Sequence, residues 1–433
     1  MSIIESEVLI VGAGVFGVST AYYLAKQSSN PSSITILDRD RPPSTPAAST
    51  DYNKIIRADY SDPLYMDLAF EAIDAWKKNS LFTTAGVYHE TGWISMGERD
   101  SDLTSQIRDN FQMSGRPDPT KDMTENEVRS SWGGILKDAD LRPFDSYYYN
   151  PSAGWAEAGA ALKIMADEAI RMGVQYKIDE ANRLMLDQHG VRGVQTNNGK
   201  IYTAKKIILA TGAWTSEMMT LTEDQLRMPM ESRIESQLTA AGVCVVHYKL
   251  TDAERGSYDQ LPVCVYGEQG ETLPPTASGL IKFTNTASFK NTVHTDNGQN
   301  ISIPPIHQRA IPYGLRRQTV DSIKDRLPTL FSKHREVDHF RLCWDAITPS
   351  QNPLITRHPH PHLSNLYLAT GGSFHCWKFL PIIGRYVTNV IYGISNGADR
   401  DKAWGWKDEQ PGQGVRGVHG SLMPWKELRD FQI

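Results

Sequence analysis

The fold is decided near the amino terminus, by Val8-Leu9-Ile10-Val11 followed directly by Gly12-Ala13-Gly14-Val15-Phe16-Gly17. The unbroken apolar run predicts a strand buried on both faces of a parallel sheet. Residues 18–27 (VSTAYYLAKQ) then have helical periodicity, and residues 34–37 (ITIL) form a second short apolar run that ends at Asp38. Together these segments predict a strand-helix-strand unit of about 30 residues.

Three glycines, Gly12, Gly14 and Gly17, match the GxGxxG pattern, and Asp38 stands at the end of the next predicted strand. The first glycine allows a tight turn, the second lets the backbone approach a pyrophosphate, and the third lets the helix pack closely on the strand. The helix N-terminus offers N–H groups and partial positive charge to phosphates. Asp38 can accept hydrogen bonds from ribose hydroxyls. This context predicts a dinucleotide site, whereas a lone glycine turn in an unrelated α/β domain would lack the aspartate.

Composition excludes several classes of protein. The 433 residues carry 45 basic and 50 acidic side chains, a net charge of −5, which argues against a general nucleic-acid binder. No apolar run is long enough to span a membrane, and Glu5 and Glu7 stand where a secretory signal would be basic. Four cysteines without CxxC spacing fit a reducing compartment and do not fit a zinc site or a disulfide framework.

Further strand and helix patterns recur in the middle and near the end of the chain. Helices are predicted at 65–77, 154–172, 320–331 and 382–392, and strands at 174–178, 191–196, 200–204, 207–210 and 366–370. The region from about 228 to 300 has short strands and polar turns. This interleaving predicts an α/β (α+β) protein, in which one nucleotide-binding domain is assembled from separated segments and a second domain is inserted into it. The expected nucleotide-binding segments are 1–60, 150–225 and 335–395, the segments of the second domain are 61–149 and 226–334, and 396–433 is a tail.

NAD and FAD share the glycine fingerprint, so the pattern alone does not choose between them. Four local sequences, however, resemble the FAD-dependent amine oxidases of the monomeric sarcosine oxidase group. They are GAGVFG, NKIIRADY (53–60), LCWDAITPSQNPLITRHP (342–359) and GGSFHCWKFLPIIG (371–384). The resemblance runs from about residue 6 to about residue 395 and favours the fungal branch of fructosyl amino acid (amadoriase), L-pipecolate and L-saccharopine oxidases.

This resemblance implies that the nucleotide-binding domain is a Rossmann-like FAD-binding domain and that the inserted domain is a catalytic domain built on a large mixed β-sheet. The substrate is then expected to lie over the flavin, between the two domains. The implied reaction oxidises the C–N bond of a secondary amine, an N-substituted amino acid, to an imine that water hydrolyses. Dioxygen then reoxidises the flavin and leaves as hydrogen peroxide. The expected partners are therefore a small amine and O2, and the resemblance favours a monomer.

The resemblance also assigns roles to single residues. Cys343 matches a cysteine that makes a thioether to the flavin, although Cys376 stays an alternative, and a small buried apolar cysteine is the ordinary reading of either. Lys282 matches a lysine held near flavin N5 that assists oxygen activation; otherwise it is a solvated lysine with its stem packed on a strand. Arg57 and Lys378 match residues that bind the substrate carboxylate, and the ordinary reading of each is a surface salt bridge.

A wider set of residues is expected to contact the cofactor, and His375 is either among them or a structural histidine. The expected cofactor contacts are Gly12, Gly14, Val15, Phe16, Gly17, Asp38, Arg39, Ser49, Lys54, Val174, Ala210, Gly212, Trp214, Cys343, Gly372, Ser373, Phe374, His375 and Lys378. Two departures from the family segment, Phe374 and Trp377, leave the shape of the substrate pocket open.

The substrate stays open at this point. The sequence CWDAITP (343–349) differs from the amadoriase pattern and favours saccharopine, pipecolate, or sarcosine and other N-methyl amino acids over fructosyl amino acids. Alternatives are a biosynthetic oxidase or cyclase acting on an N-methyl aromatic amino acid, an NAD-dependent dehydrogenase, and a non-catalytic flavoprotein. The terminal residues DFQI (430–433) are not a peroxisomal signal, so a cytoplasmic location is expected.

Overall fold

The computed structural model describes residues 3–99, 101–332, 334–407 and 426–432. Its first sheet has eight strands in the order β10-β11-β12-β1-β2-β9, with β22 paired to β12 and β21 paired to β22. The strands are β1 (Ile3–Val11), β2 (Ile34–Asp38), β9 (Gln175–Ile178), β10 (Ala181–Asp187), β11 (Gly190–Thr196), β12 (Ile201–Leu209), β21 (Leu354–Arg357) and β22 (Leu366–Thr370). Strand β1 pairs in parallel with both β2 and β12. The chain reverses its strand order there, and such a switch point opens a crevice at the carboxyl ends of the strands.

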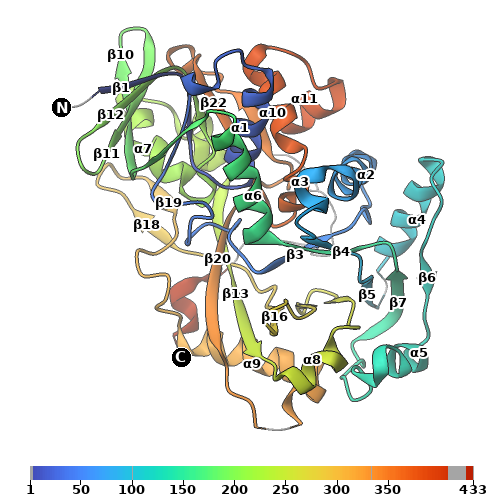
Figure 1. Ribbon diagram of the computed structural model, residues 1–433. Helices are drawn as coiled ribbons and strands as arrows, with labels where there is room; N and C mark the ends of the chain where they lie inside the picture. Colours follow the sequence, from blue (N-terminus) through green and yellow to red (C-terminus); the bar gives the residue numbers. More distant parts are fainter. Residues whose placement is uncertain (1–2, 100, 333, 408–425, 433) are drawn as a thin grey trace.

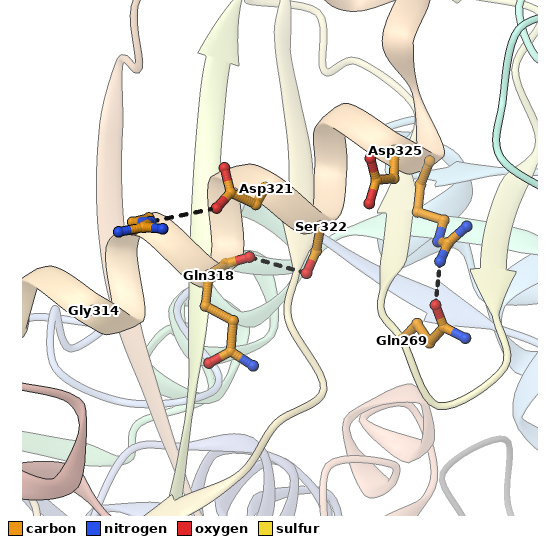
Figure 2. A pocket seen from close by; sticks show the side chains of 8 residues that line it. Gln269, Gly314, Gln318, Asp321, Ser322 and Asp325 are labelled. Atoms are coloured by element: carbon orange, nitrogen blue, oxygen red, sulfur yellow. Dashed lines mark hydrogen bonds and ion pairs between the residues drawn. The ribbon is translucent and has the colours of Figure 1, made fainter. Parts of the chain in front are cut away.

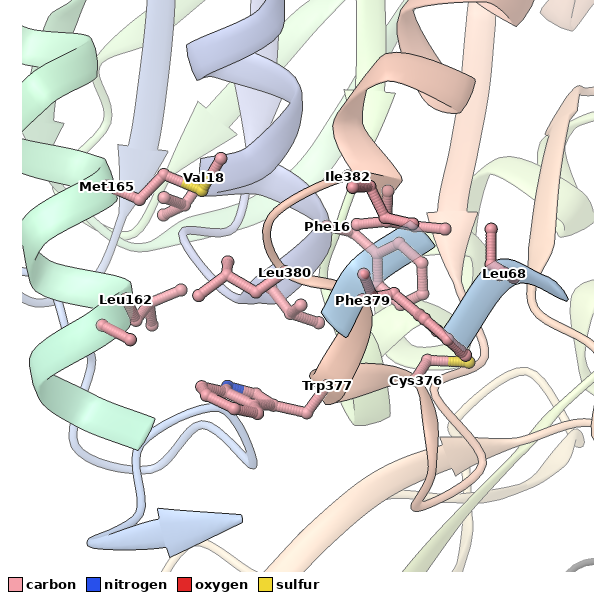
Figure 3. Packing of buried hydrophobic residues seen from close by; sticks show 14 of the residues in the cluster. Phe16, Val18, Leu68, Leu162, Met165, Cys376, Trp377, Phe379, Leu380 and Ile382 are labelled. Carbon is pink, nitrogen blue, oxygen red and sulfur yellow. The ribbon is translucent and has the colours of Figure 1, made fainter. Parts of the chain in front are cut away.

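Three helices pack together beside this sheet: α1 (Val15–Gln27), α6 (Ala158–Arg171) and α10 (Ile383–Tyr392). Figure 3 shows Val18 of α1 beside Met165 of α6, whereas Phe16 of α1 lies beside Phe379 and Ile382. Ser19 fixes the contact of α1 with α10, because its hydroxyl accepts a hydrogen bond from Gly384 N–H at 2.8 Å. The first turn of α1 is thereby held by tightly packed neighbours.

The second sheet has ten strands, and its long strands β13 and β20 run from the first sheet to the opposite end of the molecule (Figure 1). Its strands are β5 (Trp93–Glu98), β6 (Lys121–Asp122), β7 (Phe144–Asn150), β13 (Thr239–Lys249), β14 (Val263–Tyr266), β15 (Glu271–Leu273), β16 (Leu280–Thr284), β17 (Phe289–Lys290), β20 (His339–Ile347) and β23 (Lys426–Glu427). Strand β13 pairs antiparallel with β16 on one edge and β20 on the other. Side chains from these three strands therefore share one face of the sheet.

Two small sheets and the remaining helices complete the fold. The small sheets are β3 (Asn53–Ile56) with β8 (Gly154–Glu157) and β4 (Tyr88–His89), and β18 (Thr292–His294) with β19 (Asn300–Ser302). The helices are α2 (Pro63–Lys78), α3 (Ser80–Thr83), α4 (Leu103–Met113), α5 (Glu125–Ser130), α7 (Thr215–Gln225), α8 (Asp252–Tyr258), α9 (Tyr313–Arg326) and α11 (Ala398–Trp404). Along the chain, strand β3 lies between β2 of the first large sheet and β5 of the second.

The mixed α/β architecture is confirmed, but two helix predictions were wrong in their bounds. The pattern at 154–172 begins with strand β8, because Gly154–Glu157 pairs with β3 and β4, and the helix starts only at Ala158. The pattern at 320–331 is α9, which begins earlier at Tyr313 and ends at Arg326, followed by a 3₁₀ turn at Pro328–Phe331. Pro328 cannot continue an α-helix, which explains the break.

The domain boundaries stay a prediction. Strand β20, in the expected FAD-binding segment 335–395, pairs within the second sheet, and β23 of the expected tail pairs with β17. Residues 408–425 of that tail lie outside the described residues. Among the residues that the structure describes, no helix combines the length and the apolar character that crossing a membrane requires.

Candidate active site

A cavity of about 1000 Å³ lies at the carboxyl ends of β1 and β2 and extends to β20 of the second sheet. This volume stands at the upper end of ordinary ligand pockets and suits a dinucleotide better than a small amine. Its lining residues come from widely separated segments, and not every residue of a segment takes part. The segments are 11–16, 37–39, 44–54, 179–182, 210–218, 303–309, 339–345 and 371–377. Both large sheets therefore contribute to one cavity.

The glycine turn has the geometry that a pyrophosphate requires. Gly12 has φ +105°, and a Cβ there would lie 2.4 Å from the carbonyl oxygen of Ala210. A Cβ on Gly17 would lie 1.9 Å from the carbonyl oxygen of Gly12, so only glycine allows α1 to begin this close to the strand. The first turn of α1 accordingly presents its N-terminus to the cavity.

Two side chains fix the loop around this turn. Asp38 accepts a hydrogen bond from Ala13 N–H at 2.7 Å, and Ser49 Oγ accepts one from Val15 N–H at 2.9 Å. Both side chains line the cavity. Asp38 can therefore also accept hydrogen bonds from ribose hydroxyls. The Asp38 carboxylate and the N-terminus of α1 fit the adenosine and phosphate parts of FAD.

The outer end of the cavity has an aromatic and ionic wall. The Arg39 guanidinium lies 4.7 Å from the ring centroid of Trp214 and 3.3 Å from the Glu180 carboxylate. All three residues line the cavity. A flat guanidinium stacked on an indole gives a surface on which a planar base can lie.

Cys343 and Cys376 differ in their surroundings. Cys343, on β20, lines the cavity and packs with Val243 and Val245 of β13. Burial alone would lower the pKa of Lys54, which also lines the cavity, but Cys343 and Asp51 raise it. Cys376 instead lies in the apolar core near Phe379 (Figure 3), and burial raises the pKa of its thiol.

A strained turn at Ser373 and Phe374 comes directly before His375 and Cys376 in the chain. Ser373 and Phe374 both have left-handed backbones, with φ +46° and +58°. The turn is held by Asp345, whose carboxylate accepts Phe374 N–H at 2.9 Å, and a Cβ on Gly372 would lie 2.7 Å from the same carboxylate. Burial raises the pKa of Asp345, and the Phe374 N–H opposes this. Strain of this kind persists only where the surroundings over-determine it, and it places Phe374 on the cavity wall.

Arg57 and Lys378 form a buried pair of cations. Arg57 is 6% exposed and Lys378 is 5% exposed. The Arg57 guanidinium lies between the rings of Tyr60 and Trp93, at 4.8 and 5.0 Å from their centroids, and donates to the carbonyl of Asp59. In the described residues no carboxylate lies within ion-pair distance of either cation. Burial holds the pKa of Lys378 well below its usual value, and Arg57 lowers it further. Such a pair favours an incoming anion.

A hydrogen-bonded chain continues from this pair. Lys378 Nζ donates to Tyr60 Oη at 2.6 Å, and Tyr60 Oη lies 3.1 Å from His375 Nδ1. His375 Nε2 lies 2.8 Å from the carbonyl oxygen of Gln351, which can only accept, so Nε2 carries the hydrogen and Nδ1 accepts from Tyr60. His375 is thus held on both sides, outside the cavity lining.

Lys282 is buried, 3% exposed, on β16. Its ammonium donates to Asp51 Oδ2 at 2.9 Å and to the carbonyl oxygen of Asn53 at 2.6 Å. It is therefore not a solvated surface lysine. Lys282 itself is not in the cavity lining, but Lys54, the residue after Asn53 in β3, is.

The expected cofactor contacts divide into two groups. The structure places in the cavity lining Gly12, Gly14, Val15, Phe16, Asp38, Arg39, Ser49, Lys54, Ala210, Gly212, Trp214, Cys343, Gly372 and Phe374. Outside it lie Gly17, which packs on the turn; Val174, in the core before β9; Ser373, buried in its turn; and His375 and Lys378, in the cluster above.

Three features were not predicted from the sequence. They are the ion pair of Asp51 with Lys282, and the places of Asp345 and the loop at 303–309 in the cavity lining. Asp345 left a signal, because a carboxylate interrupts an apolar strand pattern in LCWDAI. Asp51 gave none, since an aspartate at the end of a Ser- and Pro-rich loop is usually solvated. The loop brings apolar residues, including the 95% exposed Ile306, to the cavity mouth.

A second hollow of about 420 Å³ lies along α9 (Figure 2). Gln318, Asp321, Ser322 and Asp325 of that helix face it, and Arg326 donates to the side chain of Gln269 across one end. None of the expected site residues borders it. Along the helix, Asp321 is paired with Arg317, and the Ser322 hydroxyl donates to the carbonyl oxygen of Gln318 at 3.0 Å.

Comparison with known proteins agrees with this geometry. Residues 7–390 match the family model described as FAD dependent oxidoreductase. L-saccharopine oxidase of Schizosaccharomyces pombe is 30% identical over 425 residues, which cover 93% of each chain. The amino acid oxidase fsqB of Aspergillus fumigatus is 26% identical, covering 90% of this chain and 92% of that protein.

Among solved structures, the fructosamine oxidase Amadoriase II of Aspergillus fumigatus superposes with a TM-score of 0.78 at 29% identity. The match covers 93% of this chain and 90% of that chain. The similarity therefore includes both large sheets and the cavity between them.

Proposed function

The chain belongs to the FAD dependent oxidoreductase family. We propose that it oxidises a secondary amine, with the cofactor in the large cavity and the substrate carboxylate at the buried residues Arg57 and Lys378. The protein is an FAD-dependent oxidase of CH–NH donors, in line with its relatives named L-saccharopine oxidase and fructosamine oxidase. The observation that carries the proposal is the buried pair Arg57 and Lys378, neither of which has an ion-pair partner among the described residues, in a protein with a cavity of dinucleotide size.

FAD, when bound, supplies the two-electron oxidation of the C–N bond and the transfer of those electrons to dioxygen. We assign the substrate carboxylate to Arg57 and Lys378, because an anion there would pair with the buried Arg57 guanidinium and favour the charged form of Lys378. The carbon next to the nitrogen gives up a hydride and the nitrogen loses a proton, which leaves an imine. Water hydrolyses the imine to an amine and a carbonyl, and O2 takes two electrons and two protons to become H2O2. The substrate class is thus an N-substituted amino acid: saccharopine, pipecolate, an N-methyl or a fructosyl amino acid.

We further propose that Cys343 binds the flavin covalently through its sulfur. Support comes from its place in the cavity wall beside Lys54, whereas Cys376 lies in the apolar core. Lys282 is proposed to assist the reaction with oxygen as a buried positive charge. We also propose that the protein is a monomer, the state that the family resemblance favours. The four cysteines are buried and unpaired, which supports a reducing compartment such as the cytoplasm.

The decisive experiment is anaerobic mixing of the purified flavoprotein with fructosyl-valine, fructosyl-lysine, saccharopine, pipecolate, sarcosine and an N-methyl aromatic amino acid. Rapid bleaching of the flavin absorbance by one compound identifies the substrate class. No bleaching by any of them, with the flavin still reducible by dithionite, would contradict these amino acids as substrates. A colourless protein that reduces nicotinamide instead would contradict the flavin assignment.

A further inference from the structure

A buried ionic cluster gathers around Asp51, where four separate segments meet. Asp51 Oδ2 accepts Lys282 Nζ at 2.9 Å and lies 3.5 Å from Lys54 Nζ. The Asp51 and Lys282 side chains are each 3% exposed. Burial alone would raise the pKa of Asp51, but Lys282, Lys54 and Arg341 hold it well below its usual range. One carboxylate is therefore the shared counter-ion of several cations.

The second sheet brings these groups to one face. His247 on β13 pairs in register with Lys282 on β16 and with His339 on β20. The rings of His247 and His339 stack with centroids 4.2 Å apart, and both nitrogens of the 1% exposed His247 have no hydrogen-bond partner. Burial lowers the pKa of His247 to about 3, so this ring is neutral and the positive charge of the cluster resides on the lysines and Arg341.

The contacts of Lys282 also fix its direction. An ammonium has three N–H donors, and Asp51 and the carbonyl of Asn53 use two of them. The third donor has no hydrogen-bond partner among the described residues. The backbone of Asp51 is fixed in turn, because its carbonyl accepts Gly159 N–H at 2.9 Å, next to the β3–β8 ribbon. A rigid carboxylate thus sets both the charge and the orientation of Lys282.

We propose that Asp51 is a positioning residue for the reaction with oxygen, which it controls by holding the ammonium of Lys282 charged and fixed beside β3, the strand whose Lys54 lines the cavity. This inference rests on the proposed role of Lys282 and extends it. The groups that face the pair are Lys54 of β3, His247 of β13, His339 and Arg341 of β20, and Asp345 near Lys54. Asp51 is the one carboxylate in direct contact with Lys282 in the part of the chain that the structure describes.

The test measures the two half-reactions separately in the flavin-loaded enzyme, by stopped-flow absorbance from pH 6 to pH 10. Asp51→Asn keeps the shape and removes the charge. Without the carboxylate, burial and Lys54 disfavour the charged ammonium. We expect reoxidation by O2 to slow on the order of tenfold or more at neutral pH. It should recover as the pH falls, because protonation restores the charge of Lys282, while substrate reduces the flavin at a nearly unchanged rate.

Two further variants separate position from charge. Asp51→Glu keeps the charge but displaces it by one methylene, so reoxidation should slow several-fold with the pH profile unchanged. In the Lys282→Met background, Asp51→Asn should add no further slowing, because Asp51 acts through Lys282. Flavin content and melting temperature are measured for every variant.

The outcomes also separate this inference from the function on which it rests. If Lys282→Met leaves reoxidation unchanged, the proposed role of Lys282 is wrong. If Lys282→Met slows reoxidation but Asp51→Asn does not, or slows both half-reactions equally and without pH dependence, the role of Asp51 is wrong. Should Asp51→Asn not fold, Asp51→Glu decides: reoxidation at the wild-type rate overturns the positioning role.

Discussion

We expect Lys378 to couple the proposed binding of the substrate carboxylate to proton uptake. In the free protein, burial and Arg57 hold its pKa well below the usual value, so the ammonium loses its proton at a pH where most lysines keep it. A bound carboxylate stabilises the charged form and raises that pKa again. Affinity is therefore highest below the free-state pKa of Lys378, and it falls as the pH rises through that pKa, by up to about tenfold per pH unit.

This is measured by titrating the flavin absorbance with a carboxylate that is not oxidised, such as propionate, between pH 6 and pH 10. Lys378→Met should weaken binding and flatten the pH dependence. Lys163→Met, on the exposed surface of α6, is the matched control and should leave both unchanged. A pH dependence that survives in Lys378→Met would assign the proton to another group.

Gly17 gives a second prediction for a single residue. A methyl group at this position would meet the Gly12 carbonyl oxygen, so Gly17→Ala must push α1 away from the turn. We expect a loss of about 1–3 kcal/mol in the free energy of unfolding, together with loss of flavin. Gly256→Ala is the control, because a Cβ there meets open space within α8. It should be neutral or slightly stabilising in urea unfolding.

At the scale of elements, α7 and the turn that follows it carry two buried carboxylates. Burial raises the pKa of Glu223 and of Glu235 to about 7. Glu235 accepts hydrogen bonds from Ser302 N–H at 3.2 Å and from the Ser216 hydroxyl, and so fixes the start of the loop at 303–309.

The folded protein binds more protons than the unfolded chain between the usual glutamate pKa of 4.5 and about 7. The free energy of unfolding should therefore fall as the pH rises across this window, by up to about 1.4 kcal/mol per pH unit for each group. Glu235→Gln should flatten this fall in melting temperatures measured from pH 5 to pH 8. Glu231→Gln, at an exposed position nearby, should not. An unchanged slope in Glu235→Gln would contradict the assignment.

Elements were predicted best where local pattern and tertiary context agree. Strand β1 and helix α1 follow from an apolar run and a glycine turn, whose geometry is local. Strand β8 was mistaken for the first turn of α6, because GWAE has no strand signal and becomes a strand only by pairing with β3, about 100 residues earlier in the chain. Asp51 was missed for the same reason: its partner Lys282 lies on a distant strand.

At the scale of the whole molecule, the cofactor cavity joins both large sheets, so flavin binding should stabilise them together. In Cys343→Ala, the proposed thioether cannot form, and acid precipitation should release the flavin into the supernatant. The melting temperature of this variant should then rise with added FAD, equivalent to about 2.7 kcal/mol at a hundredfold excess over Kd.

The wild-type protein is the control and should keep its flavin in the acid pellet, with a melting temperature that added FAD does not change. Cys376→Ala should also keep its flavin in the acid pellet, and added FAD should not change its melting temperature. Its stability should fall somewhat, because the Cys376 side chain is buried in the apolar core. Flavin that stays in the pellet of Cys343→Ala would move the attachment to another residue.

The pairing of β1 with β12 and of β12 with β22 also has a consequence for biosynthesis. A ribosome releases Gly12 early, but the strands on which the glycine turn rests follow at 201–209 and 366–370, and Cys343 and Trp377 come later than most of the chain. The nascent chain therefore carries β1 without its neighbour β12 until residue 209 has been made, and without the pairing of β12 to β22 until residue 370 has been made. Flavin loading has to follow synthesis, and cells short of riboflavin should accumulate a full-length apoprotein rather than a truncated one.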